Sequence, residues 1–217
     1  MGKNNRKKLD SWSLKAKQAG YSARSVYKLE EIDRRFQVLK GARRVIDLGC
    51  APGSWSEFTR EKRPNVKLVG IDIQPMLQYP GKFLHRSILD TEPSDYFELL
   101  GGTADLVLCD IAPNTTGNRF GDHVQQVKLA HMALETAVNT LRQGGTFVVK
   151  VFDGEDAPEF VKSFSKHFSK VKRVKPEAVR SESVEFFVVA KMKKTTVHWS
   201  PKPKTPKLPS PPEGLGE

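Results

Sequence analysis

Two charged residues interrupt the most apolar stretches of this 217-residue chain, and both could take part in chemistry. Lys150 lies inside the run Phe147–Phe152, and Glu185 directly precedes Phe186–Val189. Burying an ammonium or a carboxylate among such neighbours is costly unless the charge is paired. Lys150 must therefore reach out to solvent, pair with a carboxylate, or take part in a reaction. Two such charges in one small sheet favour a functional role.

Two aspartates directly follow other apolar runs and are therefore expected at the carboxyl ends of strands. Ligands bind at these ends in open α/β sheets. Asp110 comes directly after Leu106–Cys109 and opens a rigid turn at the mouth of the expected sheet. Asp72 comes after Val66–Ile71 and lies 19 positions beyond Gly53. An acidic residue at about that spacing from a glycine turn commonly binds a ribose diol. The alternative for Asp72 is a turn or helix-capping aspartate.

A glycine turn stands between an apolar run that ends at Ile46 and a helix-like stretch over residues 56–61. The turn is Asp47–Trp55, in which Gly49 and Gly53 let the backbone pass close to a ligand. The glycine spacing differs from the Gly-x-Gly-x-x-Gly pattern that holds a dinucleotide pyrophosphate. It therefore favours a nucleoside ligand over NAD, although such turns can also be purely structural.

The elements that must position these residues alternate between strands and helices. Nearly continuous apolar strands separated by helices are typical of a buried, mostly parallel sheet with helices on both faces. Lys28 lies in the first expected helix, residues 23–37. Considered alone, it is compatible with an ordinary solvent-exposed position on that helix. The expected strands cover residues 43–48, 66–71, 82–85, 105–109, 146–152, 170–174 and 184–190, and the expected helices cover 23–37, 56–61, 124–141 and 158–168.

Positive charge is concentrated at the two ends of the chain. The net charge is +11, yet residues 1–20 hold six lysines and arginines against one aspartate, and residues 191–217 hold six lysines against two glutamates. We therefore divide the chain into a basic arm over 1–22, a folded domain over 23–191 and a disordered, Pro/Lys-rich tail over 192–217. Basic ends on a nearly neutral core favour contact with nucleic acid, unless they only keep the protein in solution.

Several other classes of protein are disfavoured by composition. No apolar run approaches the roughly 20 residues that cross a bilayer, and no secretory signal precedes the basic start. Cys50 and Cys109 follow apolar runs and are expected to be buried and reduced. The five histidines show no paired ligand spacing, so we expect no metal site. Together these features predict a cytoplasmic protein without a membrane partner.

Five segments, in order along the chain, resemble the FtsJ-type (RlmE-like) ribose 2′-O-methyltransferases. The resemblance runs from about Ala23 to Ala190 and leaves out both basic ends. It implies a single Rossmann-like domain with a mostly parallel seven-stranded sheet and S-adenosylmethionine as cofactor. The matching segments are Ser25–Leu29, Asp47–Trp55, Asp110–Asn114, Val149–Phe152 and Ser183–Glu185.

The resemblance also implies roles for individual residues. The family's catalytic Lys-Asp-Lys-Glu tetrad matches Lys28, Asp110, Lys150 and Glu185, and its cofactor contacts match Gly53, Trp55, Asp72, Asp110 and Ser87. Two positions depart from the family pattern. Ser54 stands where a second glycine is frequent, and Ser87 stands where an aspartate often faces the adenine. A serine hydroxyl can still accept a hydrogen bond from the adenine amine, but without the charge.

By the same resemblance, the substrate is RNA, with a uridine ribose of large-subunit ribosomal RNA as the leading expectation. We expect Lys150 to act on the 2′-oxygen, as base or as electrostatic partner, while the two carboxylates orient it and Lys28 adds charge. A transfer RNA ribose, a messenger cap, or a non-catalytic role as an RNA-binding assembly factor are the alternatives. We expect a monomer that does not bind DNA.

Overall fold

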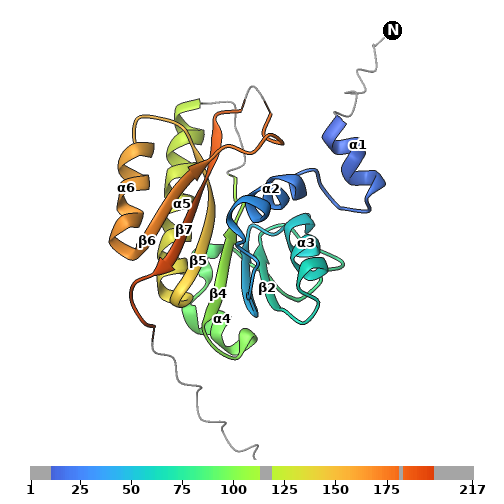
Figure 1. The fold of residues 1–217 in the computed structure, drawn as a ribbon, viewed down its shortest axis with the longest axis horizontal. Helices are drawn as coiled ribbons and strands as arrows, with labels where there is room; N and C mark the ends of the chain where they lie inside the picture. The colour runs from blue at the N-terminus through green and yellow to red at the C-terminus, as the bar shows by residue number, and fades with distance from the viewer. Residues whose placement is uncertain (1–10, 113–118, 181–182, 198–217) are drawn as a thin grey trace, which may run out of the picture.

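The computed structural model describes residues 11–112, 119–180 and 183–197, except for the side chains of residues 119, 120 and 122–124. These residues form a sheet sandwiched between two helical layers (Figure 1). No helix among them is long and apolar enough to cross a membrane. Pro113 and Asn114, which belong to the turn expected after Asp110, lie outside the described residues.

The sheet has seven strands in the order β3-β2-β1-β4-β5-β7-β6. Strands β3, β2, β1, β4 and β5 are parallel, while β7 runs antiparallel to both β5 and β6. The expected fold class, a mostly parallel seven-stranded sheet, is therefore confirmed. The strands are β1 (Arg44–Leu48), β2 (Lys67–Asp72), β3 (Lys82–His85), β4 (Ala104–Cys109), β5 (Leu141–Phe152), β6 (Phe168–Val174) and β7 (Glu185–Lys193).

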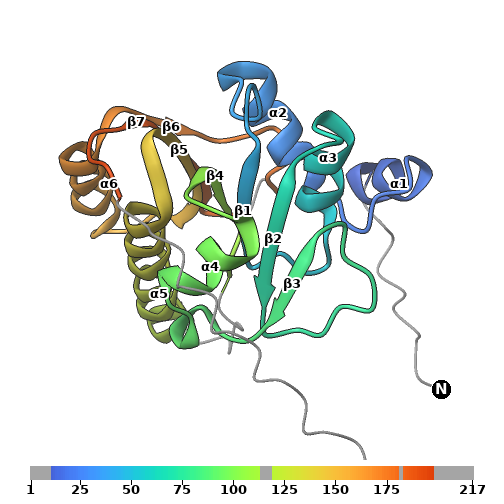
Figure 2. The ribbon, with the colours of Figure 1, turned by 90° about the horizontal axis from the view of Figure 1, so that it is seen from below.

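Helices cover both faces of the sheet, as expected (Figure 2). One layer contains α1 (Ser11–Gln18), α2 (Val26–Phe36) and α3 (Ser54–Lys62). The other contains α4 (Pro93–Leu100), α5 (Arg119–Thr140) and α6 (Ala157–His167), with the short 3-10 helix η1 (Ile88–Asp90) beside it.

Side-chain alternation along the strands divides the core in two. On β5, Phe147 and Val149 pack under the layer of α4 to α6, whereas Val148 packs under the layer of α1 to α3. Lys150 has the same parity as Val148, because successive strand residues point to opposite faces. The lysine therefore lies on the face that α2 covers.

The observed boundaries differ from the expected ones at several points. Helix α5 begins at Arg119, five residues earlier than expected, and β7 continues to Lys193, past the expected start of the tail. Helix α1, which lies within the expected basic arm, and helix α4 were not predicted. Both cysteines are buried and free, as predicted.

We predict that Leu106→Ala will lower the free energy of unfolding by about 2–5 kcal/mol, since Leu106 is fully buried on the central strand β4 and its loss leaves a cavity. The matched control is Leu77→Ala, because the Leu77 side chain is fully exposed and its truncation should change stability by less than about 0.5 kcal/mol. Urea denaturation of both variants measures the difference. Equal effects would contradict the core assignment.

Candidate active site

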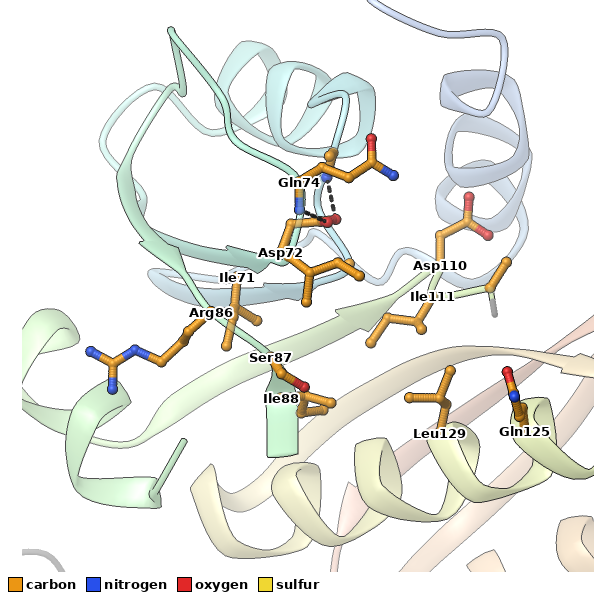
Figure 3. Close-up of a pocket in the computed structure, with 14 residues that line it drawn as sticks. Ile71, Asp72, Gln74, Arg86, Ser87, Ile88, Asp110, Ile111, Gln125 and Leu129 are labelled. Atoms are coloured by element: carbon orange, nitrogen blue, oxygen red, sulfur yellow. Dashed lines mark hydrogen bonds between the residues drawn. The ribbon is translucent and has the colours of Figure 1, made fainter. Parts of the chain in front are cut away.

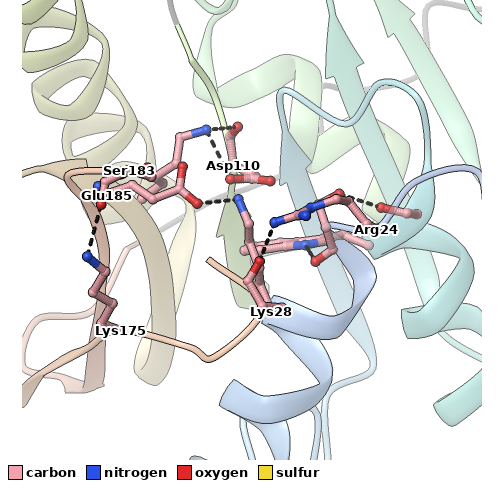
Figure 4. A network of polar contacts seen from close by, with 11 residues as sticks. Arg24, Lys28, Asp110, Lys175, Ser183 and Glu185 are labelled. Carbon is pink, nitrogen blue, oxygen red and sulfur yellow. Dashed lines mark hydrogen bonds and ion pairs between the residues drawn. The ribbon is translucent and has the colours of Figure 1, made fainter. Parts of the chain in front are cut away.

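Two ion pairs bring together the four residues that the sequence proposes as a catalytic tetrad. Lys28 Nζ lies 2.5 Å from Glu185 Oε1, and Lys150 Nζ lies 3.0 Å from Asp110 Oδ1. Lys28 and Lys150 are both buried. Lys28, Asp110 and Glu185 face one another where α2 meets the sheet (Figure 4). Residues separated by up to 157 positions thus meet in one polar cluster within an apolar core.

Helix α2 places Lys28 in this cluster because its apolar face also carries the lysine. Val26, Leu29 and Ile32 are buried against the sheet, and Lys28 lies between them on the helix. The Lys28 ammonium lies 5.6 Å from the centre of the Phe187 ring, and Phe187 is the β7 partner of Lys150. Two residues away on β7, Glu185 pairs with Phe152 and points to the same face as Phe187.

Lys150 is held by backbone contacts as well as by its ion pair. Its Nζ donates to the Asp110 carbonyl oxygen at 2.8 Å. The buried side chain of Gln126 binds the β5 backbone on both sides, donating to the Lys150 carbonyl at 3.2 Å and accepting from the Phe152 amide at 3.3 Å. Sequence reasoning missed Gln126. Its signal was an amide on the apolar face of α5, four residues before the buried Ala130.

A cavity of about 380 Å³ opens beside Asp110, at the carboxyl ends of the parallel strands (Figure 3). That volume lies within the range of sites for small molecules, about 300–1,000 Å³. Its walls combine the carboxylates of Asp72 and Asp110 with apolar side chains, which are Ile71, Ile73, Ile88, Ile111 and Leu129. Asp110 therefore belongs to both the cavity and the tetrad.

The turn between β1 and α3 forms one wall of this cavity. Gly49 has φ 71°, and a Cβ there would lie 2.3 Å from Ile111 Cγ1, so no larger residue fits. Asp72 fastens the turn, because its Oδ2 accepts from the Ala51 amide at 2.9 Å. Its Oδ1 accepts from the Gln74 amide at 2.8 Å. The position of Asp72 against the cavity is thus set by the backbone on both sides.

The other expected cofactor contacts occupy different places. Ser87 lines the cavity, and its Oγ accepts from the Leu89 amide at 3.1 Å, which leaves its hydroxyl proton and a second lone pair. Gly53 and Trp55 are not among the residues that line the cavity. Gly53 caps α3 with φ 116°, and Trp55 is buried with its Nε1 donating to the Ser25 carbonyl at 2.8 Å. Trp55 thereby ties the turn to the start of α2.

The residues around the cavity fit S-adenosylmethionine. Apolar side chains on both sides suit a flat adenine ring, and Asp72 offers carboxylate oxygens to a ribose diol. Asp110 adds a second carboxylate to the wall, which suits a ligand that carries a positive charge.

A third carboxylate, Asp47, lies buried behind the turn. Burial raises its pKa to about 7; the charges of Asp110 and Asp72 act in the same direction, and a hydrogen bond from the Ser56 hydroxyl opposes them. The Ser56 hydroxyl also lies 2.6 Å from the Tyr79 hydroxyl. Asp47 is therefore a candidate to carry a proton near neutral pH beneath the cavity.

Several known proteins are similar in sequence to this chain. Residues 21–193 match the family model described as FtsJ-like methyltransferase. Proteins named ribosomal RNA large subunit methyltransferase E are similar to this chain. The one from Novosphingobium aromaticivorans is 42% identical and covers 83% of this chain and 82% of its own length. The one from Zymomonas mobilis is 43% identical and covers 83% of each.

A solved structure has the same fold. It is a putative ribosomal RNA methyltransferase from Plasmodium falciparum, with a TM-score of 0.71 and 27% sequence identity, and it covers 80% of this chain and 98% of its own.

We predict that Asp47→Asn will remove a pH dependence of stability. An unfolded aspartate titrates near pH ~4, whereas folding raises the pKa of Asp47 to about 7, so the folded state retains the extra proton between these values. The stabilisation is complete below the unfolded pKa and is lost as pH rises through about 7. Relative to Asp47→Asn, wild-type stability should fall by up to about 1.4 kcal/mol per pH unit in this window.

Urea unfolding across roughly pH 4 to 8 tests this prediction. Asp90→Asn, which changes an exposed aspartate, is the control and should follow the wild-type profile. Parallel profiles for wild type and Asp47→Asn would contradict the assignment.

Proposed function

Since this chain belongs to the FtsJ-like methyltransferase family, we propose that it transfers a methyl group from S-adenosylmethionine to a ribose 2′-hydroxyl in RNA. The observation that carries the proposal is the meeting of two ion pairs beside a cavity that fits the cofactor, with Asp110 common to both. An arrangement of ammonium groups and carboxylates suits the alignment of a weak oxygen nucleophile with an electrophilic carbon.

We propose ribosomal RNA of the large subunit as the substrate, with a uridine as the modified nucleotide. The names of relatives about 42% identical over most of their length support the choice of RNA. The resemblance of the five sequence segments supports the ribose and the uridine. The net charge of +11 agrees with a polyanionic substrate.

When bound, the cofactor supplies an electrophilic methyl group, so the protein's task is to position the hydroxyl and to stabilise the negative charge that develops on it. Lys150 is the residue we assign to the 2′-oxygen. Its ammonium donates a hydrogen bond to the carbonyl of Asp110 and forms an ion pair with the Asp110 carboxylate; these contacts orient it and leave donor capacity for a substrate oxygen. A preorganised positive charge in a buried site stabilises a developing oxyanion without reorganisation at the moment of reaction.

Lys28 and Glu185 complete the site as a second pair. Lys28 is held by Glu185 above the Phe187 ring, next to the strand that carries Lys150. We assign Lys28 to the substrate as a source of positive charge. Glu185 keeps that charge in place and balances it, because a buried ammonium without a partner would be strongly disfavoured.

We predict that Lys150→Ala will lower methyl transfer by at least about 100-fold while cofactor affinity stays within a few-fold. The reason is that Lys150 acts on the nucleophile, whereas Asp72, Ser87 and the glycine turn hold the cofactor. Lys150→Met, which keeps the length of the side chain, should lose activity to the same degree. Lys166→Ala, at an exposed position on α6, is the control.

Radiolabelled cofactor, mixed separately with large ribosomal particles and with bulk transfer RNA, measures the reaction. Label on a ribose of the particle supports the proposal, and nuclease mapping of the label identifies the nucleotide. Unchanged turnover in Lys150→Ala would refute the assigned mechanism, and label on transfer RNA alone would refute the proposed substrate.

A further prediction concerns the departure at Ser87. We predict that Ser87→Asp will tighten cofactor binding about five-fold, because a carboxylate accepts a stronger hydrogen bond from an amine than a hydroxyl does. Aspartate can also replace serine as the acceptor for the Leu89 amide at the start of η1. Ser87→Ala should weaken binding instead. Calorimetric titration measures both variants, and an unchanged affinity in both would remove Ser87 from the cofactor site.

A further inference from the structure

A group of basic residues lies at the amino ends of the parallel strands, at the opposite end of the sheet from the active site. Arg43 and Arg44 stand at the start of β1, Lys67 stands at the start of β2, and Lys62 and Arg63 stand at the end of α3. Asp72 and Asp110, by contrast, mark the carboxyl ends of parallel strands. We call these five basic residues the amino-edge cluster.

The amino-edge cluster surrounds a hollow of about 550 Å³ whose described lining contains no acidic residue. Arg44 and Lys67 are register partners on adjacent strands, so their backbones are about 4.8 Å apart. Arg43, Lys62 and Lys67 are exposed, and Arg44 and Arg63 are half-buried. Positive charge is therefore concentrated and accessible at this edge.

The nearby carboxylates neutralise only part of the cluster: Glu61 Oε1 pairs with Lys62 Nζ at 3.0 Å, whereas Asp105 bonds elsewhere. The Oδ2 atom of Asp105 accepts from the backbone amides of Arg43 and Arg44, at 2.8 and 2.9 Å. Its Oδ1 accepts from Arg142 Nε at 2.6 Å. Burial works against ionisation of Asp105, but these hydrogen bonds outweigh it and lower its pKa. Asp105 thus already has Arg142 as its ionic partner.

Some arginines in this region make hydrogen bonds that hold loops in place, but not every member of the cluster does so. Arg60, on the same helix as Lys62, donates to the carbonyls of Pro64, Val66 and Pro80 and holds the loops together. The side chains of Arg43 and Lys67, in contrast, make no hydrogen bond or ion pair with any residue that the structure describes. The exposed side chains of Arg43 and Lys67 are therefore available to bind a ligand.

We propose that the amino-edge cluster binds the phosphate backbone of a large structured RNA, as a second contact remote from the methylated nucleotide. A single small anion would need donors that converge on one point, whereas these cations are spread around an open hollow. A polyanion gains affinity from each cation separately through the release of counterions. This inference rests on the proposed function, because it concerns how the same RNA is held.

The position of the cluster limits the size of the RNA. Strand β1, with five residues at about 3.3 Å each, separates the two edges by roughly 16 Å before loops and side chains are added. An RNA whose ribose enters the active site reaches the amino edge only if it is long or folded around the domain. The cluster should therefore favour large ribosomal RNA over short oligonucleotides.

We predict that Arg43→Gln/Lys67→Gln will weaken binding of a long, folded large-subunit ribosomal RNA fragment by at least about tenfold at low salt. The slope of log affinity against log salt should fall by about 2, because two phosphate contacts are lost. Affinity for a short oligonucleotide that carries the target nucleotide should not change. The matched control is Lys162→Gln/Lys166→Gln, which removes the same charge from exposed positions on α6.

Equal weakening in the control would overturn the inference, because RNA binding would then depend only on net charge. No weakening in the amino-edge variant would also overturn it, and would leave a protein partner as the occupant of the cluster. Amine-reactive footprinting gives an independent measure without substitutions: long RNA should protect Lys67 and leave Lys162 reactive.

Methyl transfer to the short oligonucleotide separates this inference from the proposed function. The amino-edge variant should methylate it at the wild-type rate. If neither the wild type nor the variants methylate any RNA, but the amino-edge variant still binds long RNA more weakly, the proposed function fails and the amino-edge contact stands.

Discussion

The ion pair between Lys150 and Asp110 is the interaction on which the arrangement of this site depends. Strands β4 and β5 are parallel neighbours in register, with Cys109 beside Val149, so the next residue on each chain is one of the pair. An ammonium on an apolar strand is tolerated only with such a partner. Because Asp110 also lines the cavity, the pair connects the buried charges of the tetrad to the cavity in which we propose that the cofactor binds.

The second layer of the site follows from the helix that covers this face of the sheet. Helix α2 brings Lys28 to Glu185, and Trp55 connects the glycine turn to the residue before α2. The turn, the helix and the two strands therefore support one another, and a shift of one would displace charges in another. The opposite end of the parallel strands carries the amino-edge cluster, which we propose as a second surface for the same RNA.

The alternation of apolar runs was sufficient to predict the sheet, its seven strands and the helices on both faces. It did not find α4, although Pro93 at its start, the reciprocal bonds of Glu92 and Asp95, and Gly101 at its end are recognisable signals. Helix α1 has no strong amphipathic pattern and is stabilised by packing, with Ala16 buried and Trp12 against Tyr27. The start of α5 was placed too late; Gly121 lies near its beginning, and a glycine lowers intrinsic helix propensity.

The sequence by itself identified charges within apolar runs and glycines at a turn as candidate site residues, whereas Lys28 was placed among them only by the family resemblance. It could not determine which of these residues form ion pairs with one another. Lys150 could have paired with Glu185, and only the strand register and the placement of α2 pair Lys150 with Asp110. It also left Gln126, Asp47 and the amino-edge cluster unrecognised. Those depend on contacts between elements distant in the chain, where pairing and desolvation are properties of the packed structure rather than of local composition.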